Sequence, residues 1–308
     1  MIVNGVDLIL ISVKDMERSL SFFRNVLGLA EVARGPADQA WLRDLWGLGQ
    51  GITAETAFLR QAEQTTLLEL VEFDPAAGKH LREGAEVYDY GLFDIAFRTK
   101  DVDRSLDDLC RQGYRVISPP VVYTADWAKV TVKEAVFEGP DMLPLALIQR
   151  LTDQVPFEGD FSVMIDSAQF CDDMDRAVTF YTEILGFTAV FDRDLPEGLI
   201  DPVVQTPTGT RSRMAFLVKP GARTPAVELI GTDAACGYLD RSSGPPAYGL
   251  FGLAMEVEDL RQSLEAIQGA GYRIRSGPLR LNPAGLEKVR AALVEGPNRV
   301  ILQLFEKA

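Results

Sequence analysis

Carboxylates are the main side chains in this sequence that could carry out acid–base chemistry near neutral pH. The 308 residues include 45 Asp and Glu but one histidine, His80, in the polar segment GKHLREG. The three cysteines, Cys110, Cys171 and Cys236, are odd in number and far apart, so neither a disulfide framework nor a CxxC metal site is indicated. We interpret His80 as a solvated loop residue. Acid–base chemistry in this chain must therefore depend mainly on Asp and Glu.

The composition excludes several classes of partner. The formal charge is −14 and no run of Lys and Arg occurs, whereas nucleic-acid binding needs clustered cations to neutralise phosphates. No apolar stretch reaches the ~20 residues that cross a bilayer, and the opening MIVNGVDLILISV lacks the basic region and cleavage site of a signal peptide. We expect a globular cytoplasmic protein that binds a small molecule and neither nucleic acid nor a membrane.

An internal repeat sets the architecture. The segment YGLFDIAFRTKDVDRSLDDLCRQGYRVISPP begins at Tyr90, and YGLFGLAMEVEDLRQSLEAIQGAGYRIRSGP begins at Tyr248. The same offset of 158 residues aligns SVKDMERSLSFFRNVLGL, from Ser12, with FCDDMDRAVTFYTEILGF, from Phe170. Two separate stretches that agree on one offset predict that the chain is a duplication.

A shorter period divides each half into two modules with the same order of elements. Each begins with a β-rich strand (LILISV, DIAFRT, SVMIDS or GLAMEV), which is followed by a helix and three more strands. An aspartate is placed to cap each helix and a glycine to end it, namely Asp15, Asp101, Asp173 and Asp259, then Gly28, Gly113, Gly186 and Gly271. We predict an α+β protein of four βαβββ modules.

The module boundaries follow from these patterns. One domain covers residues 1–150, with modules at about 6–75 and 90–150, and the other covers 160–308, with modules at about 160–232 and 247–306. Residues 151–159 form the predicted linker. Two longer stretches, 35–53 and 194–211, are rich in Gly, Pro and charge and fall at equivalent places in the two halves. We interpret them as loops or short helices over the mouth of a cup.

The order of elements, the phrases SLSFFRNVLGL and AVTFYTEILGF, and the FEGP and VEGP turns at Phe137 and Val294 resemble the vicinal oxygen chelate superfamily. That superfamily includes glyoxalase I, methylmalonyl-CoA epimerase, extradiol catechol dioxygenases, fosfomycin-resistance enzymes and bleomycin-binding proteins. The resemblance covers nearly the whole chain, and the four-module form is most like the extradiol dioxygenases. It implies that modules pair into two curled sheets, or cups, with metal ligands on the first and last strands of each module.

The resemblance assigns eight positions to ligands. The first-strand ligand is usually His and the last-strand ligand is usually Glu. Here the first-strand positions hold Leu8, Asp94, Asp166 and Gly252, and the last-strand positions hold Glu69, Ala146, Glu228 and Gln303. An extradiol dioxygenase would need two His and one Glu at Asp166, Gly252 and Gln303. A chain with one histidine cannot build the 2-His-1-carboxylate site of an Fe(II) enzyme, so we do not expect that chemistry.

Pairing the modules within each half defines two expected cups. The first holds Leu8, Glu69, Asp94 and Ala146, and the second holds Asp166, Glu228, Gly252 and Gln303. Glu69 with Asp94, or Asp166 with Glu228, could form a general acid–base pair. Asp166, Glu228 and Gln303 could instead hold Mg²⁺, Mn²⁺ or Ca²⁺, and no other cofactor is expected. An apolar cup could also bind a ligand without turnover, and the acids could simply face solvent at a sheet rim.

Aromatic residues near the expected mouths are candidates for stacking on a substrate. We take Tyr90, Trp127, Tyr248 and Gln303 as candidate substrate-binding residues, and expect Phe93 and Phe251 to pack the module junctions.

The preferred hypothesis is a metal-independent lyase or isomerase that acts on an aromatic or polyketide-like compound through the catalytic carboxylates Glu69, Asp94, Asp166 and Glu228. The alternatives are a sequestering or antibiotic-resistance protein, and an extradiol dioxygenase homologue that has lost its iron site. Two fused halves allow a monomer or a homodimer.

Overall fold

Each module folds as the repeat predicts, into a strand, a helix and three strands. The computed structural model describes residues 5–61, 64–76, 78–125, 129–221, 226–234, 236–239 and 244–307, so the candidate Trp127 lies outside the described residues. No helix in this described part of the chain is long and apolar enough to span a membrane.

The first half contains two modules. Their main elements are β1 (Leu8–Val13), α1 (Met16–Asn25), β2 (Ala30–Pro36), β3 (Thr53–Arg60) and β4 (Leu67–Asp74), then β5 (Gly91–Thr99), α2 (Val102–Arg111), β6 (Arg115–Ala125), β7 (Val130–Glu138) and β8 (Pro144–Arg150). Two short helices, η1 (Trp41–Leu45) and η2 (Pro140–Met142), lie in their loops.

The second half repeats this order. Its main elements are β9 (Phe161–Cys171), α3 (Met174–Thr179), β10 (Thr188–Asp194), β11 (Ser212–Val218) and β12 (Ala226–Thr232), then β13 (Gly249–Glu256), α5 (Leu260–Gly269), β14 (Arg273–Leu281), β15 (Val289–Glu295) and β16 (Ile301–Lys307). The short helix η3 (Phe180–Ile184) extends α3, and α4 (Asp201–Val204) and η4 (Pro297–Arg299) lie in loops.

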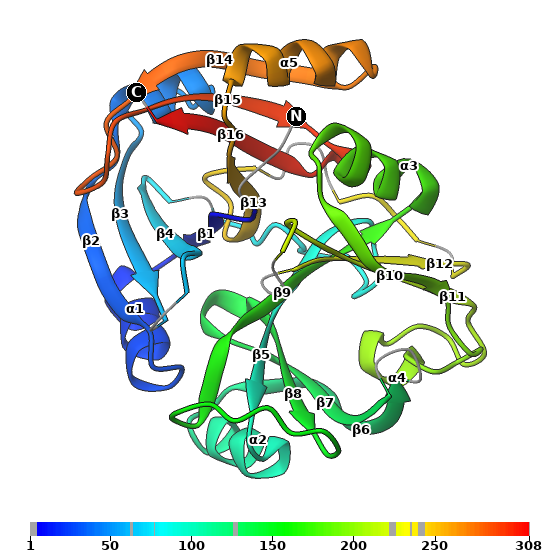
Figure 1. The fold of residues 1–308 in the computed structure, drawn as a ribbon. Coiled ribbons are helices and arrows are strands. Elements are labelled where there is room, and N and C mark those ends of the chain that lie inside the picture. The colour runs from blue at the N-terminus through cyan, green and yellow to red at the C-terminus, as the bar shows by residue number, and fades with distance from the viewer. Residues whose placement is uncertain are drawn as a thin grey trace.

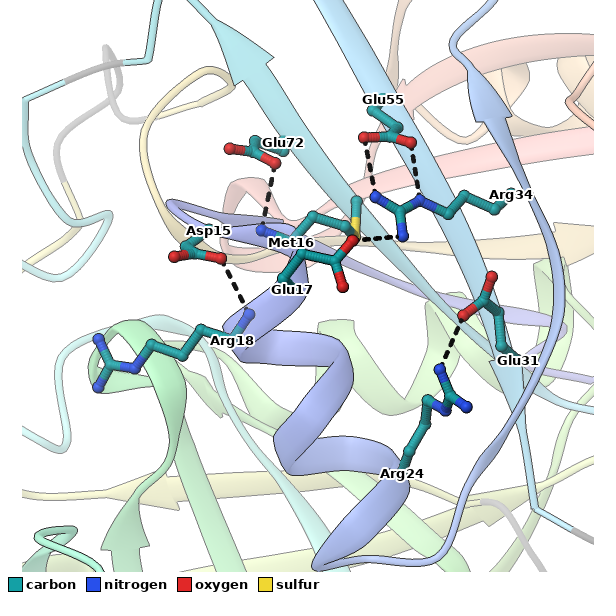
Figure 2. Close-up of polar contacts among 9 residues, drawn as sticks. All are labelled: Asp15, Met16, Glu17, Arg18, Arg24, Glu31, Arg34, Glu55 and Glu72. Carbon is teal, nitrogen blue, oxygen red and sulfur yellow. Dashed lines mark hydrogen bonds and ion pairs between the residues drawn. The ribbon is translucent and has the colours of Figure 1, made fainter.

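Each main helix begins after the predicted aspartate. The Asp15 carboxylate accepts a hydrogen bond from the backbone N–H of Arg18 at 2.9 Å, which satisfies one of the free amides at the start of α1 (Figure 2). The caps of α2, α3 and α5 make the same bond through Asp101, Asp173 and Asp259. In Figure 2, Glu72 of β4 also accepts from the N–H of Met16, which ties α1 to the last strand of its own module. The predicted helix starts are confirmed.

The strands form two curled sheets of eight strands each (Figure 1). One sheet has the order β14-β15-β16-β13-β1-β4-β3-β2 and joins modules one and four; we call it the terminal cup. The other has the order β10-β11-β12-β9-β5-β8-β7-β6 and joins modules two and three; we call it the central cup. The expectation of two curled-sheet cups is confirmed. The expected pairing of modules within each half is wrong, because both sheets are formed across the halves.

The connections between modules explain this pairing. Residues 151–160, which include the predicted linker, join β8 to β9 by a short path that keeps modules two and three in one sheet. Residues 75–90 and 233–248 are longer and carry the chain from one sheet to the other. These two connections also touch each other. The N–H of Tyr90 donates to the carbonyl of Gly237 at 2.9 Å, and the N–H of Tyr248 donates to the carbonyl of Lys79 at 3.1 Å.

Alternation along the strands separates a shared core from the two cup interiors. In β1, Ile9 and Ile11 belong to the core that the helices cover, whereas Leu8 and Leu10 face the interior of the terminal cup. Residues of all four main helices enter that shared core, including Phe23, Leu109, Ala177 and Ile267. The core is continuous across both sheets, so it fixes the cups relative to each other and leaves each concave face free to differ.

Removal of one helix cap should have a defined effect on stability. In Asp101→Ala, an N–H in the first turn of α2 loses its acceptor, and we expect the free energy of unfolding to fall by about 1 kcal/mol. The matched control is Asp107→Ala at an exposed position inside the same helix, which should change it by less than about 0.5 kcal/mol. Urea denaturation measures both. Equal effects of the two substitutions would contradict the capping role.

Candidate active site in the terminal cup

The terminal cup encloses an open cavity of about 480 Å³. Its wall is mostly apolar and includes Leu8 of β1, Phe58 of β3 and Phe305 of β16. Leu8 is one of the positions assigned to metal ligands, and two further such positions line the same cavity, Glu69 of β4 and Gln303 of β16. Their strands carry alternate side chains to the concave face, so the register of the sheet brings Leu8, Glu69 and Gln303 to one space.

The carboxyl group of Glu69 is the most perturbed acid that lines this cavity. The residue is 6% exposed, and Leu10 and Phe58 are its neighbours in register on the adjoining strands. Burial raises the pKa of Glu69 to about 8. None of the described residues donates a hydrogen bond to its carboxylate. Near neutral pH this side chain therefore exchanges readily between its acid and its base forms.

A tryptophan from the loop over the mouth contacts the opposite wall. Trp41, the first residue of η1, is buried and donates its indole N–H to Gln303 Oε1 at 2.9 Å. Its ring also packs against Phe73 of β4 and against Trp46. The stretch 35–53 was predicted to cover a cup mouth with loops or short helices, and the structure confirms this. Trp41 itself was not singled out by the sequence analysis.

Charged groups lie at the rim of the cavity. Asp7 precedes β1, and its carboxylate accepts a hydrogen bond from the N–H of Glu256 at 2.6 Å. Burial, and next the negative charge of Glu256, raise the pKa of Asp7 to about 6, although the amide bond opposes this. Lys219, which comes from module three, and Lys307 also line the cavity and lower that pKa. The cavity thus holds two acids with raised pKa values.

The central cup gathers most of the other predicted acids. Asp94 of β5, Asp166 of β9 and Glu228 of β12 occupy three of its four assigned positions, with Ala146 of β8 at the fourth. Glu134 of β7 joins them, and Tyr123 of β6 donates its hydroxyl to the Glu134 carboxylate. Asp94 and Asp166 are buried. Glu134 and Glu228 are half-buried as residues, but their carboxyl groups lie deep among protein atoms.

Burial raises the pKa of each of these four acids. It raises the pKa of Asp166 and of Glu134 to about 7, and it holds the pKa values of Asp94 and Glu228 well above the usual range. The negative charge of Asp166 adds to the effect on Asp94 and on Glu228. Asp166 and Glu228 thus interact as predicted, and the group favours its protonated state.

Apolar packing fills much of the central cup. Ile200, Val203 and Val204, in and before α4, belong to its interior cluster. Figure 1 shows α4 at the open side of this sheet, next to its edge strand β6, as predicted for the stretch 194–211. Within that packing, Asp94 Oδ1 and Asp166 Oδ1 are buried with no hydrogen-bond partner among the described residues. A protonated carboxyl group is the form that such surroundings stabilise.

The cross-half pairing regroups the predicted residues. Glu69 and Asp94 lie in different cups, so they cannot form the expected acid pair. Gln303 lines the terminal cup, apart from Asp166 and Glu228, so the three do not form the expected oxygen-ligand site. Both expectations fail because the first strands β1 and β13, and β5 and β9, are neighbours instead.

The candidate aromatic residues lie away from Glu69. Tyr90 packs on Tyr238, with ring centroids 5.0 Å apart, and Tyr248 is buried beneath the Lys14 ammonium, 4.3 Å from its ring centroid. Neither tyrosine lines the 480 Å³ cavity. Phe93 packs against Phe170, and Phe251 packs against Trp46, which confirms their predicted packing role.

His80 is buried, so its interpretation as a solvated residue is wrong. Its Nδ1 accepts a hydrogen bond from the N–H of Arg82 at 3.1 Å, and its backbone bridges to Tyr248. Burial, and next the positive charge of Arg82, lower the pKa of His80 to about 4. The imidazole is therefore neutral at physiological pH and belongs to the contact between the two long connections.

The resemblance implies a divalent metal ion, and the residues of the two cups do not fit one. In the terminal cup, Leu8 and Gly252 hold assigned positions without any ligand atom. A Cβ at Gly252 would stand 3.0 Å from the carbonyl oxygen of Ile301. Gln303 Oε1 is already bonded to Trp41. In the central cup, the part of the chain that the structure describes contains no group of three His, Cys, Asp or Glu placed to hold an ion.

Comparison with known proteins agrees with this architecture. A model of the Glyoxalase/Bleomycin resistance protein/Dioxygenase superfamily matches residues 5–147 and 164–300, which correspond to the two halves of the chain. The chain therefore belongs to this superfamily. No curated protein matches it.

Several solved structures share the whole fold. A single-residue variant of glyoxalase I from Zea mays aligns with a TM-score of 0.69 at 17% identity, covering 99% of this chain and 92% of that one. Unmodified glyoxalase I from Zea mays aligns with a TM-score of 0.66 at 16% identity and the same coverage. A candidate dioxygenase from Bacillus subtilis aligns with a TM-score of 0.59 at 11% identity, covering 99% and 86%. At these identities the likeness concerns the fold alone.

The acids of the central cup should make the protein less stable as the pH rises. Asp166 is protonated in both states below its ordinary pKa of 3.8. Between pH 3.8 and the raised value of about 7, the unfolded chain loses this proton and the folded chain keeps it. The free energy of unfolding therefore falls as the pH rises through this range. We expect Asp166→Asn to be more stable than the parent protein at pH 8 by about 1 kcal/mol or more, with a smaller difference at pH 5.

Urea denaturation of both proteins at pH 5 and pH 8 measures this effect. Asp160→Asn, an exposed position just before β9, is the matched control and should follow the parent protein. If the parent and Asp166→Asn lose stability equally between the two pH values, Asp166 is ionised in the folded state and the assignment is wrong.

Proposed function

We propose that the terminal cup binds a small, largely apolar molecule and that Glu69 transfers a proton to or from it, as in isomerase or lyase chemistry. The observation that carries this proposal is the placement of an unpartnered carboxyl group, with a pKa raised to about 8, on the wall of an open apolar cavity. A general base works best when its pKa lies near the working pH, because it is then both available and basic enough.

The chemistry requires a substrate with an acidic C–H bond, such as a carbon next to a carbonyl group. The Glu69 carboxylate accepts that proton, and the resulting acid returns it to the same or a neighbouring atom. Trp41, Phe58 and Phe305 offer flat apolar surfaces in the cavity, which suit an aromatic or polyketide-like body. Asp7 at the rim has a lower pKa of about 6, so near neutral pH it is mostly ionised and does not serve as the acid partner of Glu69.

A second function, binding without turnover, is favoured by the apolar character of the wall and by the single buried acid on it. A sequestering protein needs an apolar cavity with few polar groups that orient the ligand. In that case the hydrogen bond between Trp41 and Gln303 fixes the loop over the cavity mouth to the sheet. The protonated Glu69 then only donates a hydrogen bond to the ligand.

Exchange of carbon-bound hydrogen provides a test that needs no known product. We expect the protein to catalyse deuterium uptake next to the carbonyl group in members of a panel of aryl ketones, followed by NMR in D₂O. The rate should rise with pH and level off above about 8, because Glu69 acts as a base once it loses its proton. Glu69→Gln should lower it by about 10²–10⁴-fold.

The matched control for this substitution is Glu287→Gln. Glu287 lines the same cavity but is exposed, so its loss should leave the rate within about twofold of the parent. Tight binding of a ketone without any exchange would favour the sequestering function, and equal exchange by Glu69→Gln and the parent would exclude Glu69 as the base.

The misfit of a metal to either cup leads to a separate prediction. Treatment with a chelator should leave both the exchange rate and the melting temperature unchanged. A resident ion at 100 times its dissociation constant would add about 2.7 kcal/mol to the free energy of unfolding, which thermal denaturation detects readily. Loss of activity on chelation, restored by Mg²⁺, Mn²⁺ or Ca²⁺, would contradict the metal-independent mechanism.

A further inference from the structure

A second cavity, of about 780 Å³, lies beside the terminal cup and is separate from the one that Glu69 lines. Its inner wall is apolar and includes Trp46, Phe251, Leu293 and Ile301. Three of its other lining residues are arginines, Arg273 and Arg275 from the start of β14 and Arg299 from η4. We call this space the arginine cavity.

The three guanidinium groups have no ion-pair partner among the described residues. Arg273 and Arg275 are exposed, and Arg299 lies over the ring of Tyr238 with 4.3 Å between its central carbon and the ring centroid. Two acids also line the cavity. Asp44 is bonded through both carboxylate oxygens to Arg43, at 2.6 and 2.8 Å, and Glu295 pairs with Arg273 in strand register without an ion pair.

The internal repeat provides a comparison for this cavity. Counterparts of its residues, Arg115, Ile117, Glu138 and Met142, line a similar space of about 760 Å³ beside the central cup. There Arg115 forms an ion pair with Glu138, so the one cation at the three equivalent positions is neutralised, although Lys14, Lys79 and Arg82 also line that space. In the arginine cavity, Arg275 stands at the position of Ile117, and Arg299 at the position of Met142. The second half of the chain therefore carries cations at two positions where the first half carries apolar side chains.

We propose that the arginine cavity binds a small organic anion, with a carboxylate or phosphate group held by Arg273, Arg275 and Arg299 and an apolar body against Phe251 and Leu293. Guanidinium groups bind both kinds of anion through paired, charge-assisted hydrogen bonds. The indole N–H of Trp46 is buried, finds no acceptor among the described residues, and adds a donor on the same wall. This assignment is independent of the proton-transfer function proposed for Glu69.

The test uses the residues that the repeat itself places at these positions. Arg275→Ile and Arg299→Met copy Ile117 and Met142, so they remove the charge and keep a side chain that this fold accepts. The matched control is Arg280→Met, at an exposed position of β14 that does not line the cavity. Three probes are used. Phenyl phosphate carries both an anionic group and an apolar body, inorganic phosphate carries the anion alone, and benzyl alcohol carries the apolar body alone.

Isothermal titration calorimetry in low salt measures the binding of each probe. We expect phenyl phosphate to bind the parent protein most tightly, Arg275→Ile and Arg299→Met each to weaken it by about tenfold, and Arg280→Met to leave it unchanged. Binding should also weaken as salt is raised, because exposed charges are screened. Glu69→Gln should bind phenyl phosphate like the parent, whatever its exchange rate.

Three results would overturn the assignment. One is the absence of phenyl phosphate binding to the parent protein. Another is equal binding by the parent and by both arginine substitutions, each checked for an unchanged melting temperature. The third is equal binding of inorganic phosphate and phenyl phosphate, which would show that the apolar wall contributes nothing to binding and would exclude a preference for organic anions.

Discussion

The antiparallel contacts of β1 with β13 and of β5 with β9 are the constraint on which the rest of the structure depends. The contact of β1 with β13 joins modules one and four, from the two ends of the chain. The contact of β5 with β9 joins modules two and three, which are consecutive. Once these first strands are paired, strand alternation decides which side chain faces a cup and which faces the helices. The pairing of Leu10 with Gly252, and of Ala96 with Asp166, then sets the contents of both cups.

The module architecture was predictable from local signals in the sequence, and the pairing of modules was not. Aspartate caps, alternating strands and a fixed offset each act within one module, so they identify four modules without ambiguity. The first strands of these modules are equivalent in pattern, however, and pattern alone cannot say which is adjacent to which. The lengths of the connections differ in the corresponding sense, because the segment 151–160, which stays within one sheet, is shorter than the segments 75–90 and 233–248, which pass between the sheets.

The same limit explains which parts of the site were predictable. Glu69, Asp94, Asp166 and Glu228 occupy concave positions as expected, because that depends only on alternation within each strand. The grouping of Glu69 with Asp94 depended on the pairing and was wrong, whereas Asp166 and Glu228 belong to one module and do lie in one cup. Trp41 was missed because its role depends on how a loop folds over the mouth, and Glu134 was missed because the superfamily pattern places ligands on first and last strands, whereas β7 is neither. A glutamate facing the cup in the strand VTVKEAVFE was the available signal for Glu134.

The duplication separates structural positions from functional ones within this single chain. Arg34 of β2 pairs with Glu55 of β3 and with Glu17 of α1 (Figure 2). The equivalent positions of module three hold Asp192, Arg213 and Asp175, and there Arg213 of β11 pairs with both acids, so the signs are reversed across the strand pair. Both modules thus fix their helix to the sheet through one arginine and two acids, although the arginine lies on a different strand. The cup positions have not been kept in this way.

At the positions assigned to metal ligands, the terminal cup retains one carboxyl group, Glu69, which lies beside open space. The central cup retains three at those positions, and together with Glu134 they lie among apolar side chains. Several carboxyl groups packed together favour protonation, because a second charge nearby costs more than the first. One acid beside an open apolar cavity can lose its proton without that repulsion and can meet a ligand. The physical divergence of the two cups therefore supports the proposal that chemistry takes place in the terminal cup, and it predicts a pH-dependent contribution of the central cup to stability.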